Sequence, residues 1–390
     1  MTYYRKVGEV PRKRHLRFVP EGTESFGSEE LMGTHGFSQS SSLLYHRYSP
    51  SAIVSAEPVD DNRPELVADA PLLPRHLRTG ELPRGGDVVS GRQVLMGNDD
   101  VAIAFVAADA DSSLYRNAVG DELVYVQSGR GRLESVFGTL DVGAGDYVVI
   151  PMSATVRWVV TAGPLEALIL ESAGHLNPPQ RYLNDRGQFV EGSPYSERDL
   201  RGPNEVLVVA DDEETDVLVR HRGGLTRYRY AHHPFDVIGW DGTLYPFALS
   251  IHDFEPIVGA IHQPPPVHQT FEGPNLVVCS FVPRPFDFYP GAIKVPYHHA
   301  NVDSDEVLFY SAGNFMSRSN SGIGIGSISM HPAGFVHGPQ PGSLERAIDA
   351  DRTEELAVMI DTFHRLKLTE TARAIAAPEY AWTWAASTNR

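Results

Sequence analysis

A candidate set of metal-binding side chains lies in the last third of the chain, within the spaced motifs described below. They are two imidazoles and one carboxylate, those of His299, His337 and Glu306. Two histidines and one acid that leave coordination positions open form the ligand set that suits non-haem Fe(II). Open positions allow O2 and a chelating substrate to meet on the same ion. Asp305 is the alternative acid, but side chains alternate along a strand, so Asp305 faces outward if Glu306 faces inward.

Short strands are the elements that must position these residues. Residues two apart share one face of a strand, so a strand, a hairpin and a returning strand can direct both imidazoles and the acid to one interior point. Glycine and proline separate runs rich in Val, Ile, Tyr and Phe, which is typical of β-strands. A helical period occurs mainly near the end, in LTETARAIA and around SLERAIDA. We therefore predict an all-β fold, as a sandwich or barrel.

The chain also contains an internal repeat. The segment YRNAVGDELVYVQSGRG (115–131) aligns with HANVDSDEVLFYSAGNF (299–315). Further on, Pro151 aligns with Pro332. Self-similarity of this kind predicts two copies of one structural unit.

The first copy of the repeat has lost most of the metal-binding pattern. It keeps the acid, as Glu122, but has Tyr115 and Val156 where the second copy has His299 and His337. A copy that keeps its glycine and proline positions and loses both imidazoles is expected to be structural. We predict two barrels and one metal ion.

The repeat resembles the cupin superfamily. The second cupin motif, G-x5-P-x-G-x2-H, is complete from Gly326 to His337, and the first runs from His299 through Glu306 to Gly313, with Asn301 in place of its second histidine. The resemblance implies a double cupin, which we divide into a metal-free N-terminal barrel and a metal-binding C-terminal barrel that ends in a short helix. The expected boundaries are 1–95 for an irregular N-terminal arm, 96–200 for the first barrel and 201–390 for the second.

Composition excludes several classes of function. The 390 residues carry 33 Lys+Arg against 50 Asp+Glu, a net charge of −17 that disfavours nucleic acid or an anionic membrane as partner. There is no long apolar run, no P-loop and no GxGxxG motif after a strand, and the first residues lack an apolar core, so we expect no secretory signal. The single cysteine, Cys279, fits a reducing cytoplasm and excludes a zinc–thiolate site.

Longer segments resemble homogentisate 1,2-dioxygenase, a bicupin iron enzyme of tyrosine and phenylalanine catabolism. They are SEELMGTHGF…SSLLYHR (28–47), FDVIGWDGTLYPF (235–247), VPYHHAN (295–301) and ISMHPAGFVHGPQPGSLERA (328–347). The resemblance implies Fe(II) held by the two histidines and the glutamate. It implies ring cleavage of homogentisate by O2 to give maleylacetoacetate, and a homo-oligomer, either a trimer or a hexamer.

The resemblance also suggests roles around the metal. Asp241 stands where the family has a histidine base, and His331 is expected next to the ligands as a supporting group or proton donor. Tyr297, Asn301 and Phe315 are candidate substrate-binding residues. Five further histidines are unranked candidates for holding a substrate carboxylate: His232, His233, His252, His262 and His268.

Some positions depart from the family pattern, so other functions stay open. Ala300 replaces an arginine, Phe315 replaces a tyrosine, and Asp241 replaces the histidine base. The alternatives are a dioxygenase for another hydroquinone-type acid, such as gentisate, a non-catalytic bicupin that binds a small molecule, and a cupin isomerase that needs no O2. Oxygen uptake with substrate separates the dioxygenases from the other two.

Overall fold

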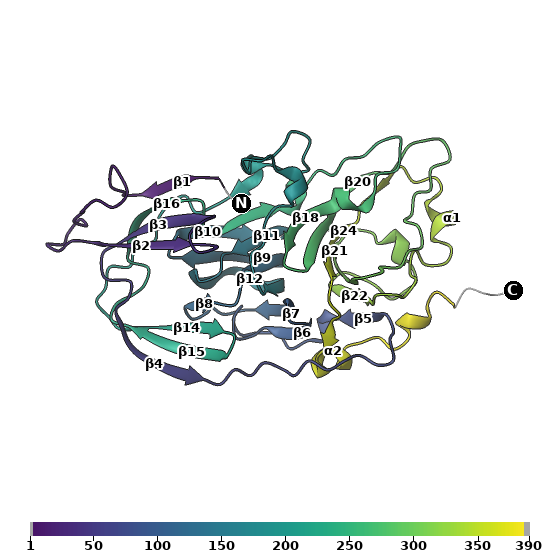
Figure 1. Ribbon diagram of the computed structural model, residues 1–390. Coiled ribbons are helices and arrows are strands. Elements are labelled where there is room, and N and C mark those ends of the chain that lie inside the picture. The colour runs from purple at the N-terminus through teal and green to yellow at the C-terminus, as the bar shows by residue number, and fades with distance from the viewer. Residues whose placement is uncertain (1–2, 386–390) are drawn as a thin grey trace.

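The computed structural model describes residues 3–385, which form 25 strands and two α-helices. Figure 1 shows two β-rich halves side by side, with the N-terminal strands at the far side of the first half. The predicted all-β double-barrel class is confirmed. The helices, α1 (Ser343–Ala347) and α2 (Glu370–Ala374), lie where the helical period predicted them. Neither is long enough to cross a bilayer, and no other described segment is a membrane-spanning helix.

The first half is a 13-stranded sheet centred on two long strands, β9 and β12, which exchange hydrogen bonds along most of their length. Its members are β4 (Ile53–Val59), β6 (Gln93–Gly97), β7 (Val101–Ala108), β8 (Tyr115–Asn117), β9 (Glu122–Ser135), β10 (Gly138–Gly143), β11 (Asp146–Ile150), β12 (Thr155–Ser172), β13 (Leu200–Arg201), β14 (Thr215–His221), β15 (Gly224–Tyr230), β17 (Phe247–Ser250) and β25 (Lys367–Leu368).

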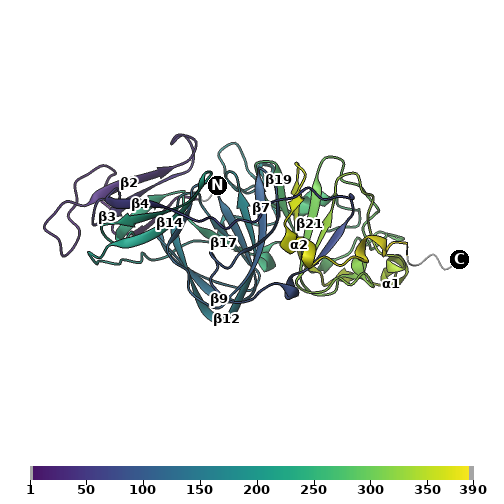
Figure 2. The same ribbon diagram turned by 90° about the horizontal axis from the view of Figure 1, so that it is seen from below.

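The second half is a six-stranded sheet with a two-stranded ribbon beside it (Figures 1 and 2). The sheet contains β5 (Arg75–Arg78), β18 (Gln269–Gly273), β19 (Leu276–Phe281), β21 (Asp305–Ala312), β22 (Ser327–His331) and β24 (Leu356–Thr362). The ribbon pairs β20 (Arg284–Pro285) with β23 (Arg352–Thr353). Strands β14, β15 and β17 fall within 201–390 in sequence but pair with the first half.

The N-terminal segment is more ordered than an irregular arm. A four-stranded sheet joins β1 (Arg5–Gly8), β2 (Ser28–Gly33) and β3 (Ser41–His46) to β16 (Val237–Gly242). Further along, β4 pairs with β15 and β5 pairs with β22, so this segment contributes strands to both halves. Long connections between these strands explain why few strand runs are visible in the sequence.

The repeat is visible in the backbone pairing. Tyr115 pairs with Val156 in the first half, and His299 pairs with His337 in the second. These four residues are the positions that the sequence alignment superimposed. The two halves therefore share one local architecture, and they differ in the side chains placed on it.

An aspartate in each copy of the repeat, at or just before the first residue of β9 or β21, holds two backbone segments in equivalent places. The carboxylate of Asp121 accepts hydrogen bonds from the backbone N–H groups of Met152 and Leu176. The carboxylate of Asp305 does the same for Ala333 and Leu366. Asp305 thus caps backbone and points away from Glu306, as the alternation of side chains predicted.

Aromatic side chains join the two halves into one core. The ring of Phe309 in β21 lies 6.0 Å from those of Phe105 and Tyr125. The hydroxyl of Tyr125 hydrogen-bonds Ser311 at 2.7 Å, across the junction. Strand β21, which carries Glu306, is therefore fixed by side chains from the first half.

Candidate metal centre

The second half brings the two predicted histidines and the glutamate together. Glu306 is the second residue of β21, and the two histidines lie on irregular segments that hydrogen-bond each other through their backbones at 2.8 Å in both directions. His299 Nε2 lies 3.5 Å from Glu306 Oε2, and His337 Nε2 lies 3.3 Å from Glu306 Oε1. One ligand atom from each residue lies within 4.8 Å of the others, which is compact enough to hold one ion.

Backbone carbonyls set the tautomer of both histidines. The Nδ1 of His299 lies 3.1 Å from the carbonyl of Tyr297, and the Nδ1 of His337 lies 3.0 Å from that of Phe335. A carbonyl only accepts, so each Nδ1 carries the proton and each Nε2 keeps a lone pair. His337 Nε2 is buried and has no hydrogen-bond partner. A buried nitrogen lone pair beside a carboxylate fits a divalent metal ion.

His331 supports the carboxylate from behind. Its Nδ1 donates to Glu306 Oε1 at 2.8 Å, and its Nε2 lies 2.9 Å from the hydroxyl of Tyr380. Its ring is fully buried, and burial together with the charge of Arg318 lowers the pKa of His331 to about 3. A neutral His331 that donates from Nδ1 accepts a hydrogen bond from the Tyr380 hydroxyl at Nε2. His331 therefore positions Glu306 and lies outside the cavity wall.

The electrostatics favour an ionised glutamate. Burial pushes the pKa of Glu306 upward, but the contacts with the imidazoles of His299, His331 and His337 outweigh burial and hold the pKa well below its usual range. The hydrogen bond with Glu306 raises the pKa of His299. A cation bound by these imidazoles would balance the negative charge of Glu306.

A cavity of about 440 Å³ opens beside these residues. Of the candidate substrate-binding residues, Tyr297 and Asn301 border it, whereas Phe315 is buried against Tyr310 and lies outside the lining. Asn301 donates to Asp361 Oδ1 at 3.1 Å. Asp361 sits opposite Glu306 in the β21–β24 register, and burial together with the charge of Glu306 raises its pKa to about 7. The size suits a small aromatic substrate.

The structure does not bring Asp241 to the metal ligands. It lies in β16, on the side of the N-terminal strands, away from β21 (Figure 1). Its carboxylate accepts hydrogen bonds from Arg14 at 2.6 Å and from Tyr4 at 2.8 Å, with Tyr45 at 3.2 Å. Within one chain, Asp241 therefore holds the N-terminal segment to the first half.

The unranked histidines divide into two groups. His262 and His268 line the cavity. His232 bonds a backbone carbonyl of the N-terminal segment, His233 accepts from a backbone N–H, and His252 adjoins Gly145 of the first half. Among the sequence candidates for carboxylate recognition, only the first two lie where a substrate could reach them.

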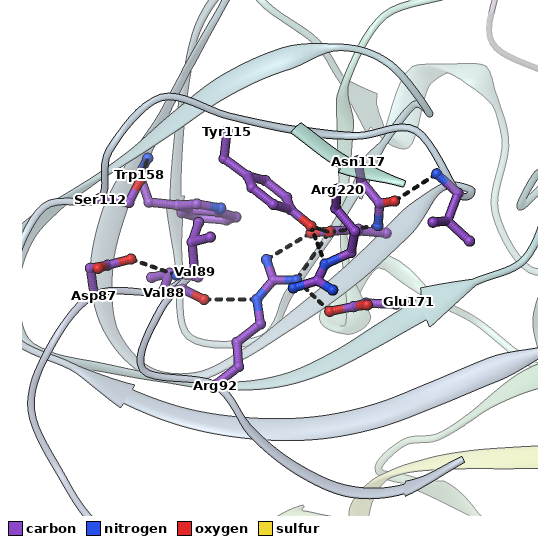
Figure 3. Close-up of polar contacts among 12 residues, drawn as sticks. Asp87, Val88, Val89, Arg92, Ser112, Tyr115, Asn117, Trp158, Glu171 and Arg220 are labelled. Atoms are coloured by element: carbon purple, nitrogen blue, oxygen red, sulfur yellow. Dashed lines mark hydrogen bonds and ion pairs between the residues drawn. The ribbon is translucent and has the colours of Figure 1, made fainter. Parts of the chain in front are cut away.

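The matching place in the first half holds an arginine. The guanidinium of Arg92 donates to Glu122 at 2.7 and 3.0 Å and to Glu171 at 2.9 Å. Figure 3 shows this side chain reaching into the cluster between Tyr115, Asn117 and Glu171. Glu122 pairs with Glu171 just as Glu306 pairs with Asp361, so the positive charge of Arg92 lies beside the acid equivalent to the metal ligand. This arrangement supports the prediction that the first half is metal-free.

Several contributors to the site were missed in the sequence. Tyr380 comes from a 3-10 helix (Tyr380–Trp382) far beyond the repeat, and Asp361 from β24. Neither belongs to a spaced motif. The only sequence signal for Tyr380 is the aromatic cluster EYAWTW near the end of the chain.

Fold and site define a class: a two-barrel β protein with one centre of two histidines and one carboxylate. A sequence model described as "Homogentisate 1,2-dioxygenase N-terminal" matches residues 41–251. The chain is 40% identical to "Putative dioxygenase SSO1533" of Saccharolobus solfataricus over 389 residues, 98% of this chain and 99% of that protein. It is 25% identical to the homogentisate 1,2-dioxygenase of Rhodopseudomonas palustris, over 82% of this chain and 73% of that protein.

The chain therefore belongs to the homogentisate 1,2-dioxygenase family, and it is a dioxygenase of that family. Among solved structures, a cupin 2 conserved barrel domain protein from Leptotrichia buccalis superimposes with a TM-score of 0.34 and 9% identity, over 78% of this chain and 98% of that one. The matched sequence model ends before the metal ligands begin, so the centre itself is defined by the geometry of the second half.

Proposed function

We propose that the protein is an Fe(II)-dependent dioxygenase that opens the ring of homogentisate with O2 and forms maleylacetoacetate. The observation that carries this proposal is the convergence of His299, Glu306 and His337 on one point at the wall of a cavity large enough for one aromatic ring. Two imidazoles and one carboxylate leave open positions on iron. Bound there, Fe(II) would supply a charge that favours the phenolate and an electron source for O2.

The residues of the chain prepare this site in distinct ways. The carbonyls that accept from the Nδ1 atoms of His299 and His337 keep the Nε2 atoms deprotonated and aimed at the ligand point. Tyr380 and His331 hold one oxygen of Glu306 in place. Each group is positioned before the metal binds, which reduces the ordering that binding requires.

The test is anaerobic loading with Fe(II), followed by oxygen-electrode and absorbance assays with homogentisate, gentisate and other hydroquinone acids. Oxygen uptake with homogentisate supports the proposal, and preferred uptake with gentisate moves the substrate to that ring. Iron-loaded protein that consumes no O2 with any of these acids contradicts the dioxygenase proposal and leaves the isomerase and binding-protein alternatives.

The catalytic role of Asp241 remains a separate proposal. The variant Asp241→Asn should lower turnover at unchanged iron content if the carboxylate takes part in the reaction. Unchanged turnover removes Asp241 from the mechanism. We further propose that the protein acts in the cytoplasm. We also propose that it forms a trimer or hexamer, and sedimentation of the purified chain would measure this oligomeric state.

A further inference from the structure

One wall of the cavity carries an arginine with unused donors. Arg284 lies in the β20–β23 ribbon, and its guanidinium sits 5.9 Å from the centre of the Phe281 ring. Its Nη1 donates to the carbonyl of Val282 at 3.1 Å. Among residues 3–385, no carboxylate forms an ion pair with Arg284, although the charges of Glu355 and Asp287 reach it. Burial lowers the pKa of this guanidinium, since most of it is shielded from water.

His268 adds a second unused polar group at the same place. Its ring packs 4.7 Å from the Phe281 ring, so His268 and Arg284 flank one aromatic side chain. The ring is 8% exposed, and its Nδ1 has no hydrogen-bond partner. Burial and the charge of Arg284 lower the pKa of His268 to about 3, so the imidazole is neutral. The backbone of Ser280 accepts a hydrogen bond from the ring, so the free Nδ1 of the neutral imidazole is a lone pair that can accept from a ligand but cannot donate to an anion.

The other cations of the cavity are already engaged. Arg318 is buried and donates to the hydroxyl of Tyr310 at 3.0 Å and to the carbonyl of Gly338 at 2.6 Å. Lys294 donates to the carbonyl of Asp287 at 2.6 Å. Arg284 is thus the cavity cation with the most hydrogen-bonding capacity left for a ligand.

The lining of the cavity also includes apolar side chains such as Val267, Leu308 and Met359. We propose that Arg284 binds the anionic group of the substrate, so that the protein selects aromatic acids over neutral phenols. Because homogentisate is the proposed substrate, this inference rests on the proposed function. An anion shielded from water gains more from a guanidinium than a neutral group of the same shape does.

The test compares two ligands that differ only in charge. Homogentisate and 2,5-dihydroxyphenylacetamide are titrated calorimetrically, without O2, into the Fe(II)-loaded full chain. Arg284→Met should weaken homogentisate roughly 10- to 100-fold, the loss expected for a charge-assisted hydrogen bond, and change the amide by less than about 2-fold. Arg284→Lys, which keeps the charge, should restore part of the affinity for the acid.

Controls separate this inference from the proposed function. Arg222→Met removes an exposed arginine in the first half and should leave both affinities unchanged. Iron content and the melting temperature are measured for every variant, and Arg284→Lys serves if Arg284→Met does not fold. Equal loss for acid and amide, no loss for either, or no binding of either overturns the anion site. Arg284-dependent preference for the acid without any O2 uptake supports the anion site and contradicts the dioxygenase.

Discussion

Glu306 is surrounded by three imidazoles that have different structural roles. His299 and His337 present Nε2 lone pairs because their Nδ1 protons are held by backbone carbonyls. His331 has both ring nitrogens engaged, by Glu306 and Tyr380. Three histidines near one acid are therefore not three equivalent ligands. The hydrogen bonds at the far nitrogen distinguish the two ligands from the supporting residue.

The first prediction concerns the two copies of the repeat. His337→Ala should abolish stoichiometric Fe(II) binding, because it removes the buried, unpaired Nε2. Val156→Ala, at the equivalent position of the first half, should leave the iron content unchanged. Metal analysis after anaerobic loading and desalting checks both. Loss of iron in both variants would show that the first half contributes to the metal site.

The second prediction isolates the support of Glu306. Tyr380→Phe removes the hydroxyl that bonds His331 Nε2 and keeps the buried ring. Loss of a group behind a metal ligand typically costs 10- to 100-fold in metal affinity, and we expect Tyr380→Phe to lose about 10-fold. Competition with a chelator measures it, and Tyr228→Phe is the control. If Tyr380→Phe and Tyr228→Phe bind the metal with affinities that agree within about 2-fold, the Tyr380 hydroxyl does not support the metal site.

Sequence reasoning selected three residues that the structure brings together, because the cupin motifs fix their spacing along the chain. The motif spacing that relates these residues, His299, Glu306 and His337, can be seen in the amino-acid sequence alone. Tyr380 and Arg284 could not be found this way, since long-range packing alone brings them to the site. For Asp241, a position in a family motif predicted a catalytic group. Within one chain, however, the strand pairing of β16 places this residue beside Arg14, and the motif alone does not reveal that surrounding.

At the scale of elements, the two repeat strands show how one framework serves two purposes. Both strands run into a glycine with positive φ, Gly129 at +82° and Gly313 at +87°. A Cβ at Gly129 would clash with the backbone carbonyl of Pro164, and one at Gly313 with that of Glu354. These close approaches explain why glycine recurs in both copies while the metal ligands do not.

The third prediction tests the arginine that lies beside Glu122. Arg92→Met leaves Glu122 and Glu171 buried without their shared cation, although Arg63 still contacts Glu171. Breaking a buried ion pair on one side costs about 3–5 kcal/mol, so the free energy of unfolding should fall by that order.

Urea denaturation measures the change. The double variant Arg92→Met/Glu122→Gln should recover part of it, because it removes the unpaired charge, and iron content should not change in either variant. Equal stability of Arg92→Met and the parent protein would show that the cluster contributes nothing to folding.

At the scale of the whole molecule, the metal-binding half is not an independent unit. Strand β5, from the N-terminal segment, completes its sheet, and Ser311 and Ser280 hydrogen-bond tyrosines of the first half. The positions of the metal ligands therefore depend on chain segments far from them in sequence. Separate expression of 201–390 would lack these contacts, including β5.

The fourth prediction concerns pH and the N-terminal sheet. His46 in β3 is buried between Asp236 and Glu30, at 2.7 and 3.0 Å. Burial opposes its charge, but the hydrogen bonds with Asp236 and Glu30 prevail and raise the pKa of His46 to about 9. A pKa above that of the unfolded chain means that the stabilisation is complete below about pH 6.5 and is lost as pH rises through about 9.

The pKa shift of His46 contributes on the order of 3 kcal/mol to the free energy of unfolding. Urea denaturation at pH 6, 7.5 and 9 should show the parent protein losing stability across this range. His46→Gln should be less stable at pH 6 and should lose most of the decline, because the glutamine carries no proton to release. The exposed His221, changed to Gln, is the matched control and should keep the parent profile. A decline of the same size in His46→Gln would assign the pH dependence to other groups.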